Sequence, residues 1–325
     1  MPHLKWLYEQ SKQPSEKYKY VGEFYVPGRN DALSALMYVR SRLAQVYASN
    51  GDFIKMHLLL GDEKFGYNLT VNPKDQPVEN LIAFFDKPKK TDFENLLEKM
   101  YNYNKSQLLE IKGTILLSQH KFKEAIIAFN EAGYSEWIRA DPFIYRIKDC
   151  LSCDAWDKNK IKYTKLSFSH RMLELDSLAA VNKENAYKYY FLMANGFYNI
   201  TYFGNSWNAS SYHRNYDYDQ MYNEQKDWEF YDCSKAHGYY EKALNLSSDR
   251  EFAAICVFMM SKCEQNDFYN NLYQFRFKDH KEYLEKKLEY RNNFRLLQDE
   301  YSDTEYYKQV LKECKYFDIF VNSYQ

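Results

Sequence analysis

The sequence predicts an all-α protein, built from antiparallel helix pairs that stack as an α-solenoid. The chain has only ten Gly and seven Pro in 325 residues, which suits long helices joined by short turns. Apolar residues also recur at helical spacing along most of the chain. A third observation is a pattern that occurs twice, in which a small residue is followed by an aromatic residue four positions later and a small one three positions after that. The two copies are Ala125, Phe129, Ala132 and Ala236, Tyr240, Ala243.

The composition limits the classes of function that the chain could have. With 45% hydrophobic and 27% charged residues, the chain can bury a large core. The 44 basic and 45 acidic side chains nearly cancel, so no overall field would attract nucleic acid, and we expect no nucleic-acid partner. No apolar run approaches the roughly 18 residues that cross a bilayer, so no membrane span is expected in this chain.

We expect the whole chain, 1–325, to form one helical-repeat array. Its first part, 1–105, reads as divergent N-terminal helices. Within this part, residues 1–30 are expected to be an irregular aromatic stretch that comes before the first helix. Asp31 is a suitable N-cap, and Thr91 with Glu94 forms a capping box. Helices are expected from Asp31 to about Ser49, from Phe53, from Pro77 and just after Thr91.

The clearest repeat spans 106–140. Gly113 precedes Ala125 by twelve residues, which places a small residue where two antiparallel helices must cross closely and leaves Phe129 to fill the space between them. The proline expected five residues after Ala132 is absent, and Trp137 stands there instead.

A second repeat is expected over 184–250. Its first helix carries Gly196, but the Ala236 pattern follows 40 residues later rather than twelve. About 28 residues are therefore inserted between the two helices, and they form a long aromatic insertion at 205–230. A further helix is expected just before this repeat, over 166–178.

The last part, 251–325, reads as C-terminal capping helices. Helices are expected at 251–264 and 278–298, and Ser302 with Glu305 begins a final one. A terminal helix with a single apolar face is what closes a helical-repeat array. The apolar stripe of that helix is Tyr307, Val310, Leu311, Cys314, Phe317 and Val321.

One motif could carry covalent chemistry, the pair Cys150 and Cys153. Two free or structural cysteines, a local disulfide, and a redox or zinc site are the alternatives. No second CxxC follows, because Cys233, Cys256, Cys263 and Cys314 occur singly.

No other motif supports chemistry. The chain has no phosphate-binding Gly-rich loop, no Gly-x-Ser-x-Gly elbow and no metal-binding histidine pair on a helix. The run from Asn215 to Asp219 resembles the start of a calcium loop, but Gln220 and Lys226 replace the required Gly and Glu. We expect no catalytic residues, no metal, no cofactor and no enzymatic turnover.

The insertion is the candidate binding site, because aromatic rings alternate there with Asn and Asp side chains. Rings supply contact area and the polar groups supply orientation, which suits a protein surface or a sugar. The alternative is a loop that folds back and buries its rings against the helices. The candidate ligand-binding residues are Trp207, Tyr212, His213, Tyr216, Tyr218 and Trp228.

The segment with Gly113, Ala125, Phe129 and Ala132 resembles the tetratricopeptide family, whose members bind peptides or partner proteins in the groove of a solenoid. The segments at 149–154 and 198–207 resemble uncharacterised helical-repeat proteins of Bacteroidetes cell envelopes. The segment from Ala186–Phe191 through Tyr202, Phe203 and Gly204 is similar to a helix of the glycan-binding lipoproteins of starch-uptake systems.

These resemblances imply a non-catalytic scaffold or adaptor that binds a protein partner through its concave helix face and insertion. The alternative that they imply is a glycan-binding protein of the cell envelope. If the chain is a mature fragment, a periplasmic or outer-membrane-associated location is expected, and otherwise a cytoplasmic one.

Overall fold

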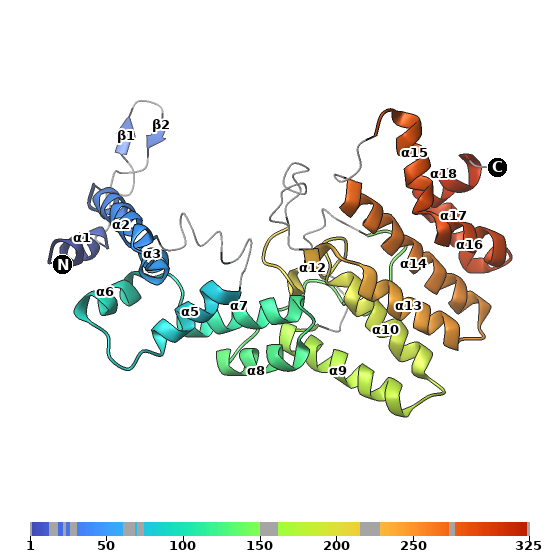
Figure 1. Ribbon diagram of the computed structural model, residues 1–325, viewed down its shortest axis with the longest axis horizontal. Helices are drawn as coiled ribbons and strands as arrows, with labels where there is room; N and C mark the ends of the chain where they lie inside the picture. The colour runs from blue at the N-terminus through green and yellow to red at the C-terminus, as the bar shows by residue number, and fades with distance from the viewer. Residues whose placement is uncertain are drawn as a thin grey trace. The chain divides into compact units, whose positions relative to one another are not determined.

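The protein is described by a computed structural model, which covers residues 2–12, 19–21, 24–26, 31–60, 69, 75–149, 162–214, 228–272 and 277–323. Over these residues the helices are joined by connecting segments, and the only strands are one short hairpin, so the all-α prediction is confirmed (Figure 1). The chain divides into two compact units, Met1–Lys112 and Gly113–Gln325.

The first unit holds small helices around a modest core. Its described elements are α1 (Pro2–Ser11), β1 (Lys19–Val21), β2 (Phe24–Val26), α2 (Asp31–Ser49), α3 (Phe53–Leu60), α5 (Asp75–Phe85) and α6 (Asp92–Met100). Helix α1 packs on α2, α2 on α3, and α3 on α5 and α6. The predicted capping box is present, because Glu94 N donates to Thr91 Oγ1 at 3.3 Å and Thr91 N donates to Glu94 Oε2 at 2.8 Å.

The prediction of irregular structure over 1–30 was wrong for Pro2–Ser11, Lys19–Val21 and Phe24–Val26. Helix α1 covers Pro2–Ser11, and Leu4 is buried against α2 with Leu7 and Tyr8 beside it. These three residues have helical i, i+3, i+4 spacing, which indicates a helix with one apolar face. The many aromatic residues nearby made this pattern hard to recognise in the sequence. The strands β1 and β2 also pair as an antiparallel hairpin, with Tyr20 opposite Tyr25.

The second unit is a longer succession of helices. Helix α7 (Lys105–Ser118) contains the division between the units and leads to α8 (Phe122–Ala132), α9 (Lys165–Val181), α10 (Ala186–Asn199), the 3₁₀ turn η2 (Trp207–Ala209), α12 (Trp228–Tyr231), α13 (Ser234–Leu246), α14 (Arg250–Asn271), α15 (His280–Glu289), α16 (Asn292–Tyr301), α17 (Glu305–Glu313) and α18 (Lys315–Ser323). Helices α8, α9, α10, α13 and α14 each pack against the next in this order (Figure 1).

The close crossing predicted at Gly113 is confirmed. A Cβ atom added to Gly113 would lie 2.5 Å from Phe129 Cε1, a distance that requires the aromatic ring to move. Ala125, Phe129 and Ala132 are all buried on α8. The helix ends at Gly133, whose φ of 78° is the left-handed conformation that glycine adopts without strain.

We expect Gly113→Leu to lower the free energy of unfolding by about 1–3 kcal/mol, because the new side chain must displace the Phe129 ring from a packed crossing. Chemical denaturation followed by circular dichroism measures this change. Gly238→Ala is the matched control, because no atom lies within 4 Å of the position that a Cβ would take there. An unchanged denaturation midpoint for Gly113→Leu would contradict the close approach of Gly113 to Phe129.

Gly196 does not repeat the environment of Gly113. Its nearest contact is Met172 Sδ of α9, at 2.8 Å from an added Cβ, rather than an atom of α13. The Ala236, Tyr240, Ala243 face of α13 nevertheless packs on α10, where the Tyr240 hydroxyl donates to Asn195 Oδ1 at 2.7 Å. Helix α10 is thus held between α9 and α13.

Two of the predicted C-terminal helices are each divided in two. The helix predicted over 278–298 breaks into α15 and α16 at Arg291, where Glu264 of α14 accepts the backbone N–H groups of Asn292 and Asn293 at 3.0 Å. A carboxylate supplied by another helix therefore begins α16, and no local sequence signal reveals it.

The last predicted helix breaks into α17 and α18 at Cys314. Its N-cap is Thr304, whose hydroxyl accepts Tyr307 N at 3.1 Å, and not the predicted Ser302. Glu251 of α14 adds a second cap, accepting the N–H groups of Glu305 and Tyr306 at 2.8 and 2.9 Å. Both C-terminal helices α16 and α17 are therefore anchored on carboxylates of α14.

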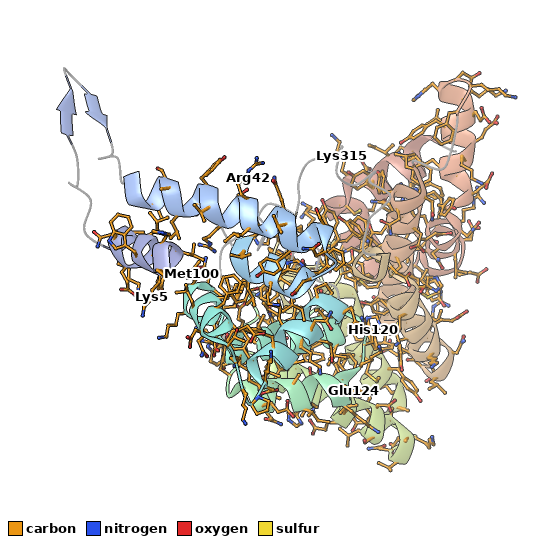
Figure 2. The ribbon with its side chains drawn as sticks, turned by 60° about the vertical axis from the view of Figure 1, so that its left-hand side comes forward. Lys5, Arg42, Met100, His120, Glu124 and Lys315 are labelled. Carbon is orange, nitrogen blue, oxygen red and sulfur yellow. The ribbon has the colours of Figure 1, made fainter. Side chains whose placement is uncertain are left out.

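The turn between α7 and α8 is made by His120, which has a φ of 60° and is labelled in Figure 2. Its ring meets the Phe197 ring edge-on, with 4.9 Å between centroids. Burial, assisted by the Lys235 ammonium, lowers the pKa of His120 to about 4. At neutral pH this histidine is an uncharged packing residue.

Candidate interaction site

The start of the insertion is fastened to the segment between α8 and α9. Ser206 Oγ donates to Ala140 O at 2.9 Å. The Asn208 carboxamide donates to Trp137 O at 2.9 Å and accepts Arg139 N at 3.0 Å. The Asn208 side chain thus donates one hydrogen bond to the backbone of residues 137–139 and accepts one from it, as a neighbouring peptide group would.

Trp207 stands between Ser206 and Asn208 in the sequence and is only 5% exposed. The guanidinium groups of Arg139 and Arg214 each lie 5.3 Å from its ring centroid, within the range of a cation–π interaction. Arg214 is itself buried, and its Nη1 donates to the carbonyl oxygens of Tyr202 and Gly204 at 3.2 and 3.0 Å. Trp207 is therefore part of the packed interior.

Tyr212 is half-buried and is held over a lysine with no exposed surface, Lys165. Lys165 Nζ lies 4.1 Å from the Tyr212 ring centroid and donates to Thr114 Oγ1 at 2.8 Å. The Tyr212 hydroxyl is 3.0 Å from the same Thr114 oxygen, and Glu136 Oε2 lies 3.5 Å from Lys165 Nζ. Since Lys165 touches both Tyr212 and Glu136, the insertion and the segment after α8 meet at this point.

The next candidate, His213, is exposed beside Tyr212. Tyr216 and Tyr218 lie outside the described residues, as do Cys150 and Cys153. Trp228 begins α12, and its side chain is also outside the described part of the chain. Of the predicted residues whose side chains the structure describes, Trp207 is buried, Tyr212 is half-buried and His213 is exposed.

The residue that sequence reasoning missed is Trp137, which is 52% exposed although its backbone is firmly held. Trp137 pairs with Thr164 in an antiparallel bridge, in which Ile138 N donates to Tyr163 O at 2.8 Å and Lys165 N donates to Glu136 O at 2.9 Å. The only sequence signal was that Trp137 replaced an expected proline.

We call the exposed group around this residue the Trp137 surface. It consists of Tyr134, Glu136 and Trp137 of one segment, together with Tyr212, which meets Glu136 through Lys165, and the adjoining His213. Tyr134 is 44% exposed, so the surface presents two large aromatic side chains to solvent, and the backbone of Trp137 is held by Asn208 on one side and by the 163–165 backbone on the other. Rigid exposed aromatic residues are common anchors of protein interfaces.

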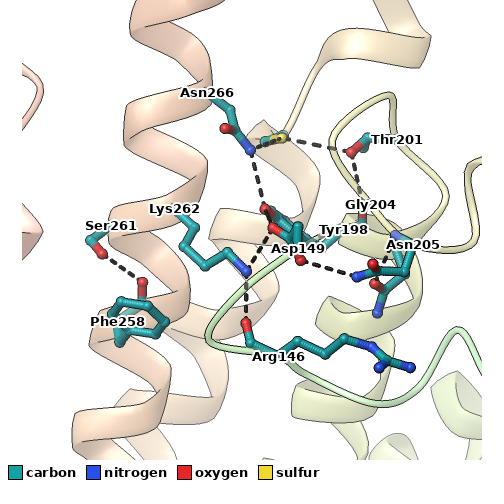
Figure 3. A network of polar contacts seen from close by, with 12 residues as sticks. Arg146, Asp149, Tyr198, Thr201, Gly204, Asn205, Phe258, Ser261, Lys262 and Asn266 are labelled. Carbon is teal, nitrogen blue, oxygen red and sulfur yellow. Dashed lines mark hydrogen bonds and ion pairs between the residues drawn. The ribbon is translucent and has the colours of Figure 1, made fainter. Parts of the chain in front are cut away.

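A second group of polar contacts lies around Asp149 (Figure 3). Asp149 Oδ2 accepts the Tyr198 hydroxyl at 2.6 Å and is paired with Lys262 Nζ at 2.7 Å. Its Oδ1 accepts Asn205 Nδ2 at 3.1 Å, and Lys262 Nζ also donates to Arg146 O at 2.7 Å. One carboxylate therefore joins the insertion, α10 and α14.

Three titratable groups of α10 and α14, Tyr198, Cys256 and Cys263, favour their neutral forms. Burial and the nearby Asp149 carboxylate raise the pKa of Tyr198 well above its usual value. Burial also raises the pKa of the Cys256 and Cys263 thiols. A nucleophile is normally activated by a lowered pKa or an adjacent base, and these three groups show the opposite shift.

Asp267 of α14 has a pKa raised to about 7 by burial and by the neighbouring carboxylates of Asp232 and Glu264. A carboxyl group in that range suits general acid–base work. Glu264, however, already caps α16 through Asn292 and Asn293. We interpret the raised pKa of Asp267 as a consequence of crowding three carboxyl groups, which favours keeping one of them protonated.

Within the described residues, no group of three or more His, Cys, Asp and Glu side chains is arranged to hold a metal ion. None of the helices in the same part of the chain is long and apolar enough to cross a bilayer. Comparison of the chain with family models, with curated proteins and with solved structures finds no match.

Proposed function

We propose that this protein is a non-catalytic scaffold, built of tetratricopeptide-like helix pairs stacked as a solenoid, which binds a partner protein. The contact surface combines the Trp137 surface with the insertion and the neighbouring helix face. The side-by-side packing of α8, α9, α10, α13 and α14 supports the repeat architecture. The observation that carries the binding role is Trp137, a half-exposed tryptophan on a fixed backbone.

The physical argument concerns the entropy of binding. Ordering a mobile loop on association costs free energy, whereas an anchor that is already rigid avoids that cost. Trp137 has its carbonyl oxygen bonded to Asn208 and its neighbours bonded to Tyr163 and Lys165. It offers a large apolar area next in sequence to Glu136, whose carboxylate approaches the same Lys165 ammonium as the Tyr212 ring, so polar contacts can fix the orientation of a partner.

The test compares Trp137→Ala with Trp6→Ala. Trp6 is a matched control, because it is 59% exposed and belongs to the other compact unit. Peptides selected from a displayed library against the unsubstituted protein should bind Trp137→Ala at least about tenfold more weakly, the size of effect typical of an interface anchor. They should bind Trp6→Ala with unchanged affinity, and both variants should keep the thermal midpoint.

A glycan array with the same three proteins separates the two candidate functions. Glycan binding that is lost in Trp137→Ala, with no peptide selected, would replace the protein partner by a sugar. Peptide binding that is equal in all three proteins would contradict the role of Trp137.

A further inference from the structure

A row of three aromatic rings joins α10 to α13, two helices that lie side by side (Figure 1). The Tyr239 ring of α13 meets the Tyr190 ring of α10 with 5.9 Å between centroids, and the Phe197 ring of α10 with 5.1 Å. Tyr190 and Tyr239 are half-buried, whereas Phe197 is only 3% exposed. The row therefore begins in the core at Phe197 and reaches solvent at the two tyrosines.

Two exposed lysines of α13 lie over this row. Lys235 Nζ is 5.2 Å from the Phe197 ring centroid, and Lys242 Nζ is 4.5 Å from that of Tyr239 and 5.7 Å from that of Tyr190. These distances are within the range of cation–π interactions, which hold an ammonium group close to a ring in its charged form. We call Lys235, Lys242, Tyr190, Tyr239 and Phe197 the lysine–aromatic strip.

The two ammonium groups of the strip have no carboxylate in ion-pair contact among the residues that the structure describes. Other surface lysines do have such a partner, as Lys308 has Glu305 at 2.7 Å. The strip thus holds two positive charges in place on aromatic rings and leaves both of them available to an anion.

We propose that the lysine–aromatic strip binds an acidic segment of a partner protein, with one carboxylate on Lys235 and a second on Lys242. The two lysines are seven residues apart on α13, which places their Cα atoms roughly 10 Å apart at 1.5 Å per residue. A polyproline II segment has three residues per turn and advances about 3.1 Å per residue, so acidic side chains three residues apart share one face at about 9 Å. The residues between them lie over Tyr190 and Tyr239, since segments of this conformation commonly bind aromatic surfaces.

The surroundings of the strip favour a short acidic segment over a long polyanion. Burial and the Asp176 carboxylate of α9 raise the pKa of Tyr239. Burial lowers the pKa of His120, whose ring meets Phe197, and the Asp232 carboxylate acts on it in the opposite direction. These two carboxylates would repel a chain of phosphates, whereas a segment with two acidic side chains needs to meet only the two ammonium groups.

The strip shares no residue with the Trp137 surface, so it is a second contact for a protein partner. It rests on the proposed function only in that both surfaces bind protein. Trp137→Ala should therefore leave binding at the strip unchanged, and the failure of one proposal can be told from the failure of the other.

The test measures the binding of fluorescein-labelled peptides to the full chain by fluorescence anisotropy. The probe is an amidated Glu-Pro-Pro-Glu peptide, whose prolines favour the polyproline II conformation, and the control peptide is Gln-Pro-Pro-Gln. Only the glutamate peptide should bind. Lys235→Gln and Lys242→Gln should each weaken its binding by about three- to tenfold, as for the loss of one charged contact. The double variant should bind it no better than the glutamine peptide.

Lys287→Gln is the matched control, because Lys287 Nζ lies 5.7 Å from the Tyr283 ring centroid on α15 and the substitution removes the same charge. Its affinity for the glutamate peptide should be unchanged. The substituted lysines of the strip are exposed, so these variants should keep the thermal midpoint of the unsubstituted protein.

Three outcomes would overturn the proposal. The first is that the glutamate peptide does not bind, or binds no better than the glutamine peptide. The second is equal binding of the glutamate peptide by the unsubstituted protein and the double variant, or its loss in Trp137→Ala, either of which would place the contact elsewhere. The third is a labelled single-stranded DNA that binds more tightly than the peptide and is lost in the double variant, which would replace the acidic segment by nucleic acid.

Discussion

Replacing Trp207 by alanine is expected to lower the free energy of unfolding of the second unit by about 3–5 kcal/mol, the usual cost of removing a buried tryptophan. Trp207 is 5% exposed, and the guanidinium groups of Arg139 and Arg214 each lie 5.3 Å from its ring centroid. The substitution leaves a cavity and removes the ring from both cations, of which Arg214 is buried. Urea denaturation followed by far-UV circular dichroism measures the loss.

Trp137→Ala is the matched control, because Trp137 lies in the segment to which Asn208 binds and is 52% exposed. Its stability should change by about 0.5 kcal/mol or less, as for most surface positions. The two variants thus separate the roles of two neighbouring tryptophans, one for packing and one for binding. If Trp207→Ala unfolds at the same urea concentration as the unsubstituted protein, the start of the insertion is not part of the core.

Sequence reasoning located most helices because their signals are local. The capping box of Thr91 and Glu94 and the crossing of Gly113 with Phe129 depend on residues that are near in sequence or in adjacent helices, and both are present. The break at Arg291 has no such signal. It depends on Glu264, which lies on another helix and supplies the cap of α16.

The same distinction applies to the candidate site. Trp207 and Trp137 are both tryptophans in connecting segments, and composition gives no reason to bury one and expose the other. Their environments are decided by Asn208 and Ser206, which attach one connecting segment to the other across about 70 residues of sequence. Lys165 was overlooked for a related reason, since a lysine at a helix start normally lies in solvent, whereas here Thr114, Glu136 and Tyr212 surround it.

Asp149→Asn is expected to lower the free energy of unfolding by about 3–5 kcal/mol, because it leaves the buried Lys262 ammonium without its counter-charge. The Asp149 and Lys262 side chains are only 14% and 12% exposed. The substitution keeps the size of the side chain, so the loss reports charge rather than packing. Urea denaturation at neutral pH provides the measurement.

The matched control is Asp303→Asn, which breaks the pair of Asp303 with Arg250 at 2.6 Å, a similar distance, with side chains that are 68% and 57% exposed. Water screens that pair, so its urea midpoint should not move. The double variant Asp149→Asn, Lys262→Met removes both charges and should recover part of the loss, because an apolar pair is less costly to bury than a single charge. A double variant no more stable than Asp149→Asn would mean that the Tyr198 and Asn205 hydrogen bonds to Asp149, rather than the ion pair, join the insertion to α10 and α14.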